Sequence, residues 1–199
     1  MAVNLQKGQK VDLKKSNGSK LTKLMVGLGW DAANAEGGFF KKLFSGKKDI
    51  DCDASVFVCK NGKLTSMEDV VYFGNLTHKS GAIKHMGDNL TGEGEGDDEQ
   101  IFVDLDKLPS EYDKLVFVVN VYQAVSRKQH FGMIKNAFIR IMDGDTNEEL
   151  IHYNLTDKYD NMLAMIVGEV YKRGNDWKFN AVGNGTTDPG LQELSKRFM

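Results

Sequence analysis

The chain has 199 residues, 41% of them apolar and 27% charged, which suits one soluble globular domain over residues 1-199. A net charge of −2 argues against a nucleic-acid surface, because such surfaces usually carry a basic face. The sequence has no run of 18 apolar residues and no signal-peptide pattern, so we expect a cytoplasmic protein without a membrane span.

The amino-terminal half predicts strands, because its apolar residues recur at every second position. Residues 21–30 place Leu24, Val26 and Leu28 on one side of the first predicted strand. Residues 51–59 alternate in the same way. This period of two is typical of strands that are covered on one face.

Two cysteines lie seven positions apart in the second of these strands. Cys52 and Cys59 therefore point to opposite faces, and we expect two plain thiols and no disulfide. Asp51 and Asp53 share the face opposite the apolar residues, where the simplest interpretation is ordinary solvent-facing acids.

A basic and aromatic stretch, Phe39 to Lys48, separates the first two predicted strands. The simplest interpretation is a loop whose aromatic side chains cover a sheet edge. The alternative is a loop that binds a membrane surface or a partner protein.

The remaining strands follow in quick succession. The continuous apolar run Leu115 to Val119 predicts a strand that is buried on both faces. Turn signals separate the strands at Asn61-Gly62, at Asp143-Gly144-Asp145 and at Gly174-Asn175. The later strands are expected at 136–142, 149–155, 163–171 and 176–183.

Helical patterns are few and short, at 108–112, 123–130 and 190–198. Many strands and few short helices predict an all-β fold, either a β-sandwich or a barrel.

The acidic, glycine-rich segment 87–99 is the strongest functional signal. Residues 86–106 contain eight carboxylates and no lysine or arginine, and three glycines alternate with acids between Thr91 and Asp97. So many like charges in one ordered loop repel one another, so the loop either stays solvated or binds a cation. A solvated acidic loop is the usual outcome for such a run.

Calcium is the cation that suits this segment best. It takes six to eight hard oxygen ligands with loose geometry, whereas magnesium demands a stricter octahedron. Asn89 and Thr91 add neutral oxygens, and the glycines allow backbone carbonyls to turn toward one point. Asp31 follows the first predicted strand, which is a typical place for a further ligand.

The segment is not an EF-hand. Asp88 and Glu99 have the spacing of an EF loop, but Leu90 and Gly92 occupy two ligand positions and Glu93 stands where the motif needs glycine. Asp143 to Asn147 also begins like an EF loop, yet we interpret it as a hairpin turn between two strands.

Several blocks of the sequence together resemble a known family. The stretch Lys84 to Glu99 resembles the signature of the TerD family, which covers bacterial tellurium-resistance and general stress proteins. Val26 to Asp31, Asp51 to Ser55, Asn136 to Arg140 and Trp177 to Gly183 resemble further blocks in the same order. The resemblance spans nearly the whole chain. Cys52 departs from it, because leucine is common there, and Phe39 to Lys48 is longer and more basic than expected.

This resemblance implies a β-sandwich with few short helices that binds two calcium ions in loops at one end. It places the metal ligands among Asp31, Asp51, Asp53, Asp88, Asn89, Thr91, Asp97, Asp98 and Glu99, with carbonyl oxygens from Gly92 and Gly94.

Two classes of function remain open at this point. The first is a non-enzymatic, calcium-binding stress protein that acts as a sensor, a buffer or an interaction module. Its partners would be other stress or tellurium-resistance proteins or a membrane-associated complex, and not nucleic acid. The second is a metal-dependent hydrolase or phosphate-handling enzyme that uses the same carboxylates.

The sequence offers little for that second class. It contains no phosphate-binding loop, and its four histidines show neither metal spacing nor a serine or cysteine motif. His85 is expected to be a surface strand histidine, although it lies only three residues before Asp88.

Overall fold

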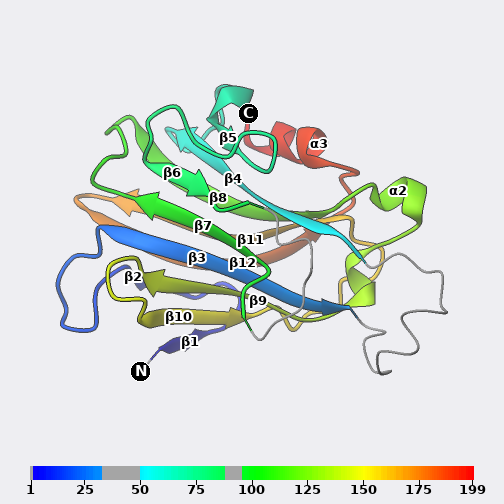
Figure 1. Cartoon of the computed structure of the whole chain (residues 1–199), viewed down its shortest axis with the longest axis horizontal. Helices are drawn as coiled ribbons and strands as arrows, with labels where there is room; N and C mark the ends of the chain where they lie inside the picture. Colours follow the sequence, from blue (N-terminus) through cyan, green and yellow to red (C-terminus); the bar gives the residue numbers. More distant parts are fainter. Residues whose placement is uncertain (1, 33–49, 88–95) are drawn as a thin grey trace.

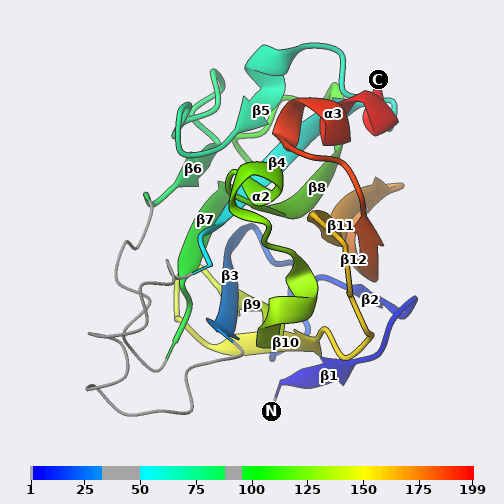
Figure 2. The same cartoon turned by 90° about the vertical axis from the view of Figure 1, so that its right-hand side faces the viewer.

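A computed structural model describes residues 2–32, 50–87 and 96–199. Two six-stranded sheets face each other, so the fold is the predicted β-sandwich with a few short helices (Figure 1). Figure 2, a view along the sandwich, shows the two sheets as separate layers. Within the described ranges, no helix has the length and apolar character that crossing a membrane would need.

The first sheet has the strand order β1-β10-β9-β3-β7-β6. All its neighbouring strands are antiparallel except β1 and β10, which are parallel. The bounds are Val3–Leu5 for β1, Lys23–Ala32 for β3, Ile83–His85 for β6, Glu99–Asp104 for β7, Ile134–Asp143 for β9 and Glu149–Asn154 for β10.

The second sheet has the order β2-β12-β11-β8-β4-β5 and is antiparallel throughout. Its strands are β2 (Lys10–Asp12), β4 (Cys52–Lys60), β5 (Val70–Val71), β8 (Tyr112–Val121), β11 (Ala164–Arg173) and β12 (Asp176–Thr186). The helical pieces are α2 (Ala124–Arg127), α3 (Leu191–Ser195) and the 3-10 turns Met67–Asp69, Phe131–Met133 and Lys196–Phe198.

The amino-terminal segment joins both sheets. β1 adds an edge strand to the first sheet, and β2 adds one to the second, only a few residues later. Between them, the Gly8 N–H donates to the Ala181 carbonyl at 2.7 Å and the Ala181 N–H donates to the Gln9 carbonyl at 3.0 Å. This short stretch therefore closes one side of the sandwich.

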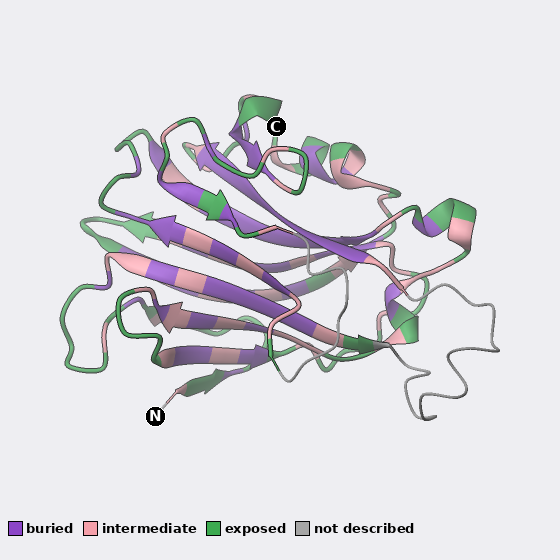
Figure 3. Ribbon diagram, viewed as in Figure 1, coloured by how far each residue is buried: buried purple, intermediate pink, exposed green. Residues whose placement is uncertain are grey.

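The main core lies between the sheets, where the alternation expected from the sequence is confirmed. Leu24, Val26 and Leu28 on β3 are buried, as are Ala54 and Val56 on β4. Figure 3 shows buried positions along strands of both sheets. The predicted turns are also confirmed: Asn61 and Gly62 adopt φ of 51° and 73°, as a tight hairpin between antiparallel neighbours requires.

Strand β4 corrects the expectation of one solvent-facing side. Every residue from Cys52 to Cys59 is buried, because a second core covers the outer face of the second sheet. Phe57, Val116 and Leu194 belong to this second core, and Leu194 comes from α3. The two cysteines are free and buried, with Cys52 in the main core and Cys59 in the second, as their spacing predicted.

One expected helix needs correction, and one strand was not predicted. Residues 108–112 form no helix; Leu108 is buried in the main core and Tyr112 already begins β8. The end of the acidic stretch is a strand, β7, which lies between β3 and β6. Ile101 and Val103 alternate toward the core in this strand, but the acidic residues around them made the pattern hard to recognise in the sequence.

Candidate metal site at one end of the sandwich

One end of the sandwich gathers acids from both sheets. β3 ends there at Ala32, directly after Asp31, and β4 starts there at Cys52, directly after Asp51. β7 starts at the same end, because it runs antiparallel to β3 with Glu99 opposite Leu28. The predicted ligands at this end within the described residues are Asp31, Asp51, Asp53, Asp97, Asp98 and Glu99. The other five, Asp88, Asn89, Thr91, Gly92 and Gly94, lie outside the described residues, as do residues 39–48.

Glu99 links the two sheets. Its carboxylate is 2% exposed and accepts a hydrogen bond from the backbone N–H of Ala54 on β4. His85 Nε2 lies 3.4 Å from the same carboxylate oxygen and 3.2 Å from the Ala54 carbonyl. Because His85 Nδ1 accepts from the Gly87 N–H at 3.1 Å, these contacts assign the imidazole proton to Nε2. His85 is buried, so the expectation of a surface histidine was wrong.

Asp98 is fixed to the end of β3. Its N–H donates to the Leu28 carbonyl at 2.8 Å, and its carboxylate accepts from the Trp30 N–H at 2.7 Å. Burial raises the pKa of Asp98, against the effect of the Trp30 hydrogen bond, and the charges of Asp31 and Asp97 raise it further. A bound cation would relieve both unfavourable effects.

Asp31 extends the group at the end of β3. Its carboxylate accepts a hydrogen bond from the Asn136 amide at 2.8 Å, and the residue is exposed. Asn136 adopts φ of +53°, a conformation that asparagine tolerates better than most residues. The contact ties the end of β3 to β9.

Asp51 and Asp53 flank the buried thiol of Cys52. Asp51 pairs with Arg127 of α2 at 3.3 Å, and Asp53 is 6% exposed with its carboxylate 3.4 Å from the Asn120 amide. Asp53 is therefore not the solvent-facing acid of the simplest interpretation. Burial raises the pKa of Cys52 well above its usual value, and the charges of the two flanking acids, Glu99 and Asp98 add to the effect. Four carboxylates thus act on one sulfur atom.

Asp97 lies apart from this group. Its two oxygens accept from Arg140 Nε at 2.7 Å and from a terminal Arg140 nitrogen at 3.1 Å, and the Gln100 amide donates to it at 3.1 Å. The Asp97 side chain is fully buried under these groups. It rests on the backbone of Gly27, where an added Cβ would lie 2.2 Å from the carboxylate carbon. No role in the site was predicted for Arg140 or Gly27 from the sequence. Arg140 lies 43 residues from Asp97 in the chain, so their contact leaves no local pattern.

The donor set suits a hard cation, because it consists of carboxylate oxygens from three strand ends. Within residues 2–32, 50–87 and 96–199, however, no three carboxylate, imidazole or thiol groups surround one point closely enough to hold a metal ion. A complete site at this end therefore needs ligands from the acidic segment as well.

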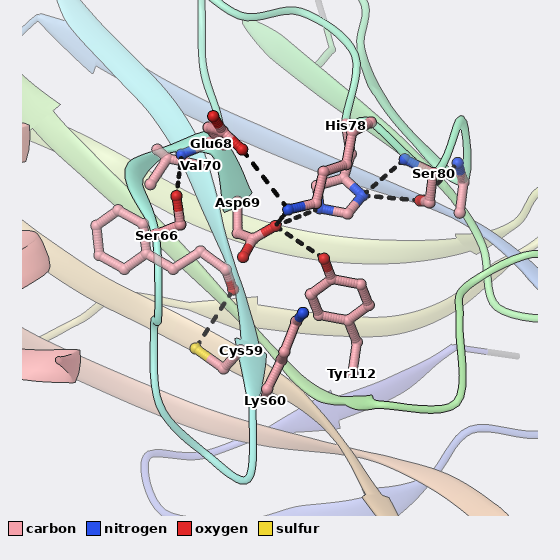
Figure 4. A network of polar contacts seen from close by, with 12 residues as sticks. Cys59, Lys60, Ser66, Glu68, Asp69, Val70, His78, Ser80 and Tyr112 are labelled. Atoms are coloured by element: carbon pink, nitrogen blue, oxygen red, sulfur yellow. Dashed lines mark hydrogen bonds and ion pairs between the residues drawn. The ribbon is translucent and has the colours of Figure 1, made fainter.

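A second buried polar network lies around Asp69 (Figure 4). Asp69 is 1% exposed, and one of its oxygens accepts from the Tyr112 hydroxyl at 2.8 Å, from Lys79 at 2.8 Å and from His78 Nε2 at 3.1 Å. Ser80 Oγ lies 2.7 Å from His78 Nδ1. The fold thus assembles serine, histidine and aspartate in a chain that the sequence did not reveal.

This network stabilises the turn from His78 to Ala82. Ser80 Oγ also accepts the Ala82 N–H at 3.2 Å, and the Ser80 N–H donates to His78 Nδ1 at 3.3 Å. A cavity of about 210 Å³ lies elsewhere, between Phe131, Leu155 and Asp160. In this structure Ser80 therefore serves to close a turn.

Comparison with known proteins identifies relatives along the whole chain. The family model described as TerD domain matches residues 1–198. The chain is 54% identical over 200 residues to "Stress response protein SCP2" of Bacillus subtilis (strain 168), with 100% of both chains covered. It is 42% identical over 186 residues to "Tellurium resistance protein TerD" of Serratia marcescens, which covers 93% of this chain and 91% of the relative.

Among solved structures, a protein of unknown function called SAV2460 has a similar fold. The TM-score is 0.69, and the match covers 89% of this chain and 96% of that one. At 21% identity this likeness supports the sandwich fold alone.

Proposed function

The chain belongs to the TerD domain family of tellurium-resistance and general stress proteins, and from that premise we propose that it binds calcium at the acidic end of its sandwich. The observation that carries the proposal is that carboxylates at the ends of β3, β4 and β7, strands of two different sheets, lie at one end of the sandwich. Burial disfavours the charged state of Asp98, and the charges of Asp31 and Asp97 add to this effect. A divalent cation bound beside Asp98 would favour its charged state again.

In this proposal the described carboxylates supply the rigid part of the site, from Asp31, Asp51, Asp53, Asp98 and Glu99. Asp88, Asn89 and Thr91 add side-chain oxygens, and Gly92 and Gly94 add carbonyl oxygens. Two ions match so large a set, since each calcium takes six to eight oxygens. Asp97 is the weakest candidate ligand, because Arg140 and Gln100 already hold its carboxylate.

Calcium would act locally. It would neutralise the acids and fix the acidic segment against the ends of both sheets, so that this end presents one defined surface. The protein would then serve as a non-enzymatic sensor, buffer or interaction module, with other stress or tellurium-resistance proteins or a membrane-associated complex as partners. Cytoplasmic placement is part of the same proposal.

Calorimetric titration with calcium and with magnesium tests this function. We expect about two calcium ions per chain and weaker magnesium binding. Asp98→Asn keeps an oxygen for the Trp30 N–H but loses the charge, so it should weaken calcium binding by about tenfold or more. Asp106→Asn is the matched control, since Asp106 follows β7 at the opposite end and pairs with exposed Lys20.

Trp30 provides a second measurement, because its backbone bonds Asp98 and its ring packs beside the main core. Saturating calcium should change its fluorescence and raise the unfolding temperature. A wild-type protein that shows no heat, no fluorescence change and no stabilisation would refute calcium binding.

A further inference from the structure

We propose that Arg140 is a positioning residue for the carboxyl end of the acidic segment: it holds Asp97 on the outer face of the first sheet and so directs Asp98 and Glu99 toward the site. The consequence for calcium rests on the proposed function, whereas the positioning itself is a property of the metal-free chain.

The first support is the geometry of the clamp. Arg140 donates two parallel hydrogen bonds to the two oxygens of Asp97, at 2.7 and 3.1 Å. Such a two-point contact between a planar guanidinium and a carboxylate fixes direction as well as distance. The Gln100 amide adds a third donor at 3.1 Å, and the clamp leaves the Asp97 side chain with no exposed surface.

The second support is the space that Gly27 leaves for the Asp97 carboxylate on the outer face of the sheet. Gly27 lies opposite both Arg140 and Gln100 in the strand register, so β9 and β7 present these two donors on either side of it. Its neighbours Val26 and Leu28 face the core, which puts Gly27 on the outer face. Because an added Cβ would collide with the Asp97 carboxylate, the absence of a side chain at Gly27 makes room for the clamp.

The third support is how three successive acids are separated. Asp97 goes to Arg140 on the outer face, Asp98 to the Trp30 N–H at the end of β3, and Glu99 to the Ala54 N–H in the other sheet. Adjacent carboxylates repel one another, and the positive charge of Arg140 compensates that of Asp97, whose side chain has no exposed surface. If Asp97 turned to a metal ion, Arg140 would lose both of its hydrogen bonds to that carboxylate.

Arg140 is itself held in place from the other side. A terminal nitrogen of Arg140 lies 3.1 Å from Glu149, whose second oxygen lies 3.0 Å from His152 Nδ1. The His152 ring stacks on Phe138 with 5.1 Å between centroids. This chain of contacts crosses β9 and β10, so the guanidinium is already oriented before any ligand binds.

Amide hydrogen exchange on the metal-free protein tests the positioning. Arg140→Met should accelerate exchange of the Trp30 and Asp98 amides by about tenfold or more, since both bonds depend on where Asp98 lies. Arg140→Lys retains the charge without the two-point contact and should give an intermediate rate; it serves as the readout if the methionine variant does not fold. Unchanged exchange in both variants would overturn the proposal.

Arg197→Met is the matched control. Arg197 makes a similar two-point pair with Asp188, beside α3 and outside the first sheet. It should leave exchange at Trp30 and Asp98 at the wild-type rate. An equal acceleration there would mean that any lost arginine–aspartate pair loosens the chain, and the specific role of Arg140 would be wrong.

A double-mutant cycle with calcium calorimetry separates a positioning residue from a ligand. Asp97→Asn and Arg140→Met should each weaken calcium binding by a similar factor of about ten, and the double variant should be no weaker than either. If Asp97→Asn alone removes a bound ion while Arg140→Met has no effect, Asp97 is a direct ligand and the proposal fails. If wild type binds no calcium, the proposed function fails while the exchange measurement still decides the role of Arg140.

Discussion

The carboxylate of Glu99 on β7 accepts a hydrogen bond from the backbone N–H of Ala54 on β4, so an acid of one sheet is bonded to the main chain of the other. This contact lies at the end where the acids gather, and both partners are buried. Glu99 is therefore a structural link as well as a candidate ligand, and the two roles need separate measurements.

Substitution of Glu99 distinguishes those roles. Glu99→Gln keeps an oxygen acceptor for Ala54 and should leave the stability of the metal-free protein nearly unchanged, while calcium affinity falls. Glu99→Ala leaves the buried N–H without its acceptor and should cost about 1–3 kcal/mol in addition. Urea unfolding without calcium measures the difference. Equal destabilisation by both variants would show that charge, and not the hydrogen bond, supports the link.

The glycine beneath Asp97 predicts a large effect from one methyl group. Gly27→Ala would place Cβ 2.2 Å from the Asp97 carboxylate carbon and should destabilise the protein by about 1–3 kcal/mol. Gly190→Ala is the control, because its added Cβ would meet only Glu193 at 3.5 Å and should stay within about 0.5 kcal/mol of wild type. Thermal unfolding of both variants checks the prediction, and a neutral Gly27→Ala would contradict it.

The second core predicts that the short helix α3 contributes strongly to stability. Leu194 has no exposed surface, and its replacement by alanine should cost about 2–5 kcal/mol. Leu191 packs against the same cluster but is only partly buried, so Leu191→Ala should cost less than half as much. Comparable losses in urea unfolding would mean that α3 does not cover the sheet as described.

The network around His78 predicts a stability that falls in mild acid. Burial lowers the pKa of His78, although the hydrogen bond to Asp69 opposes this, and the charges of Lys79 and Lys60 lower it further. The unfolded chain then takes up a proton more readily than the folded one, so stability is lost as pH falls through 6.5, the ordinary histidine value. Urea midpoints at pH 7.5 and 5.5 should differ less in His78→Gln than in wild type. If the two midpoints differ as much in His78→Gln as in wild type, the acid sensitivity comes from other groups.

The positions of strands and turns could be predicted from the sequence, whereas the burial of individual residues by distant segments could not. Alternation at Leu24, Val26 and Leu28 fixed the inner face of β3, and Asn61-Gly62 fixed a hairpin, because both signals are local. The burial of both faces of β4 was not predictable from its own residues, since α3 is distant in sequence. His85 likewise looked like a surface residue until Glu99 and Ala54 were placed beside it.

The same distinction holds for the candidate site. Family resemblance and charge pattern indicated the acids, and the fold brings Asp31, Asp51, Asp53, Asp98 and Glu99 to one end. Neither signal showed that Asp97 pairs with Arg140, because that contact depends on the register between β3 and β9. Pairings between distant strands carry no local signature in the sequence. Only the three-dimensional structure shows that Asp97 has a different partner from Asp98 and Glu99.

The way β1 and β2 close the sandwich also constrains the order of events during synthesis. Val3 to Leu5 pair with Ile151 to Tyr153, and Lys10 to Asp12 pair with residues 178–180. β1 and β2 thus wait during synthesis for partner strands that lie far behind them in the chain. Contacts of such long range slow folding and leave unpaired strand edges exposed in the meantime. The nascent chain would therefore pass through an aggregation-prone state in which these strand edges are unpaired, although both are paired in the finished fold.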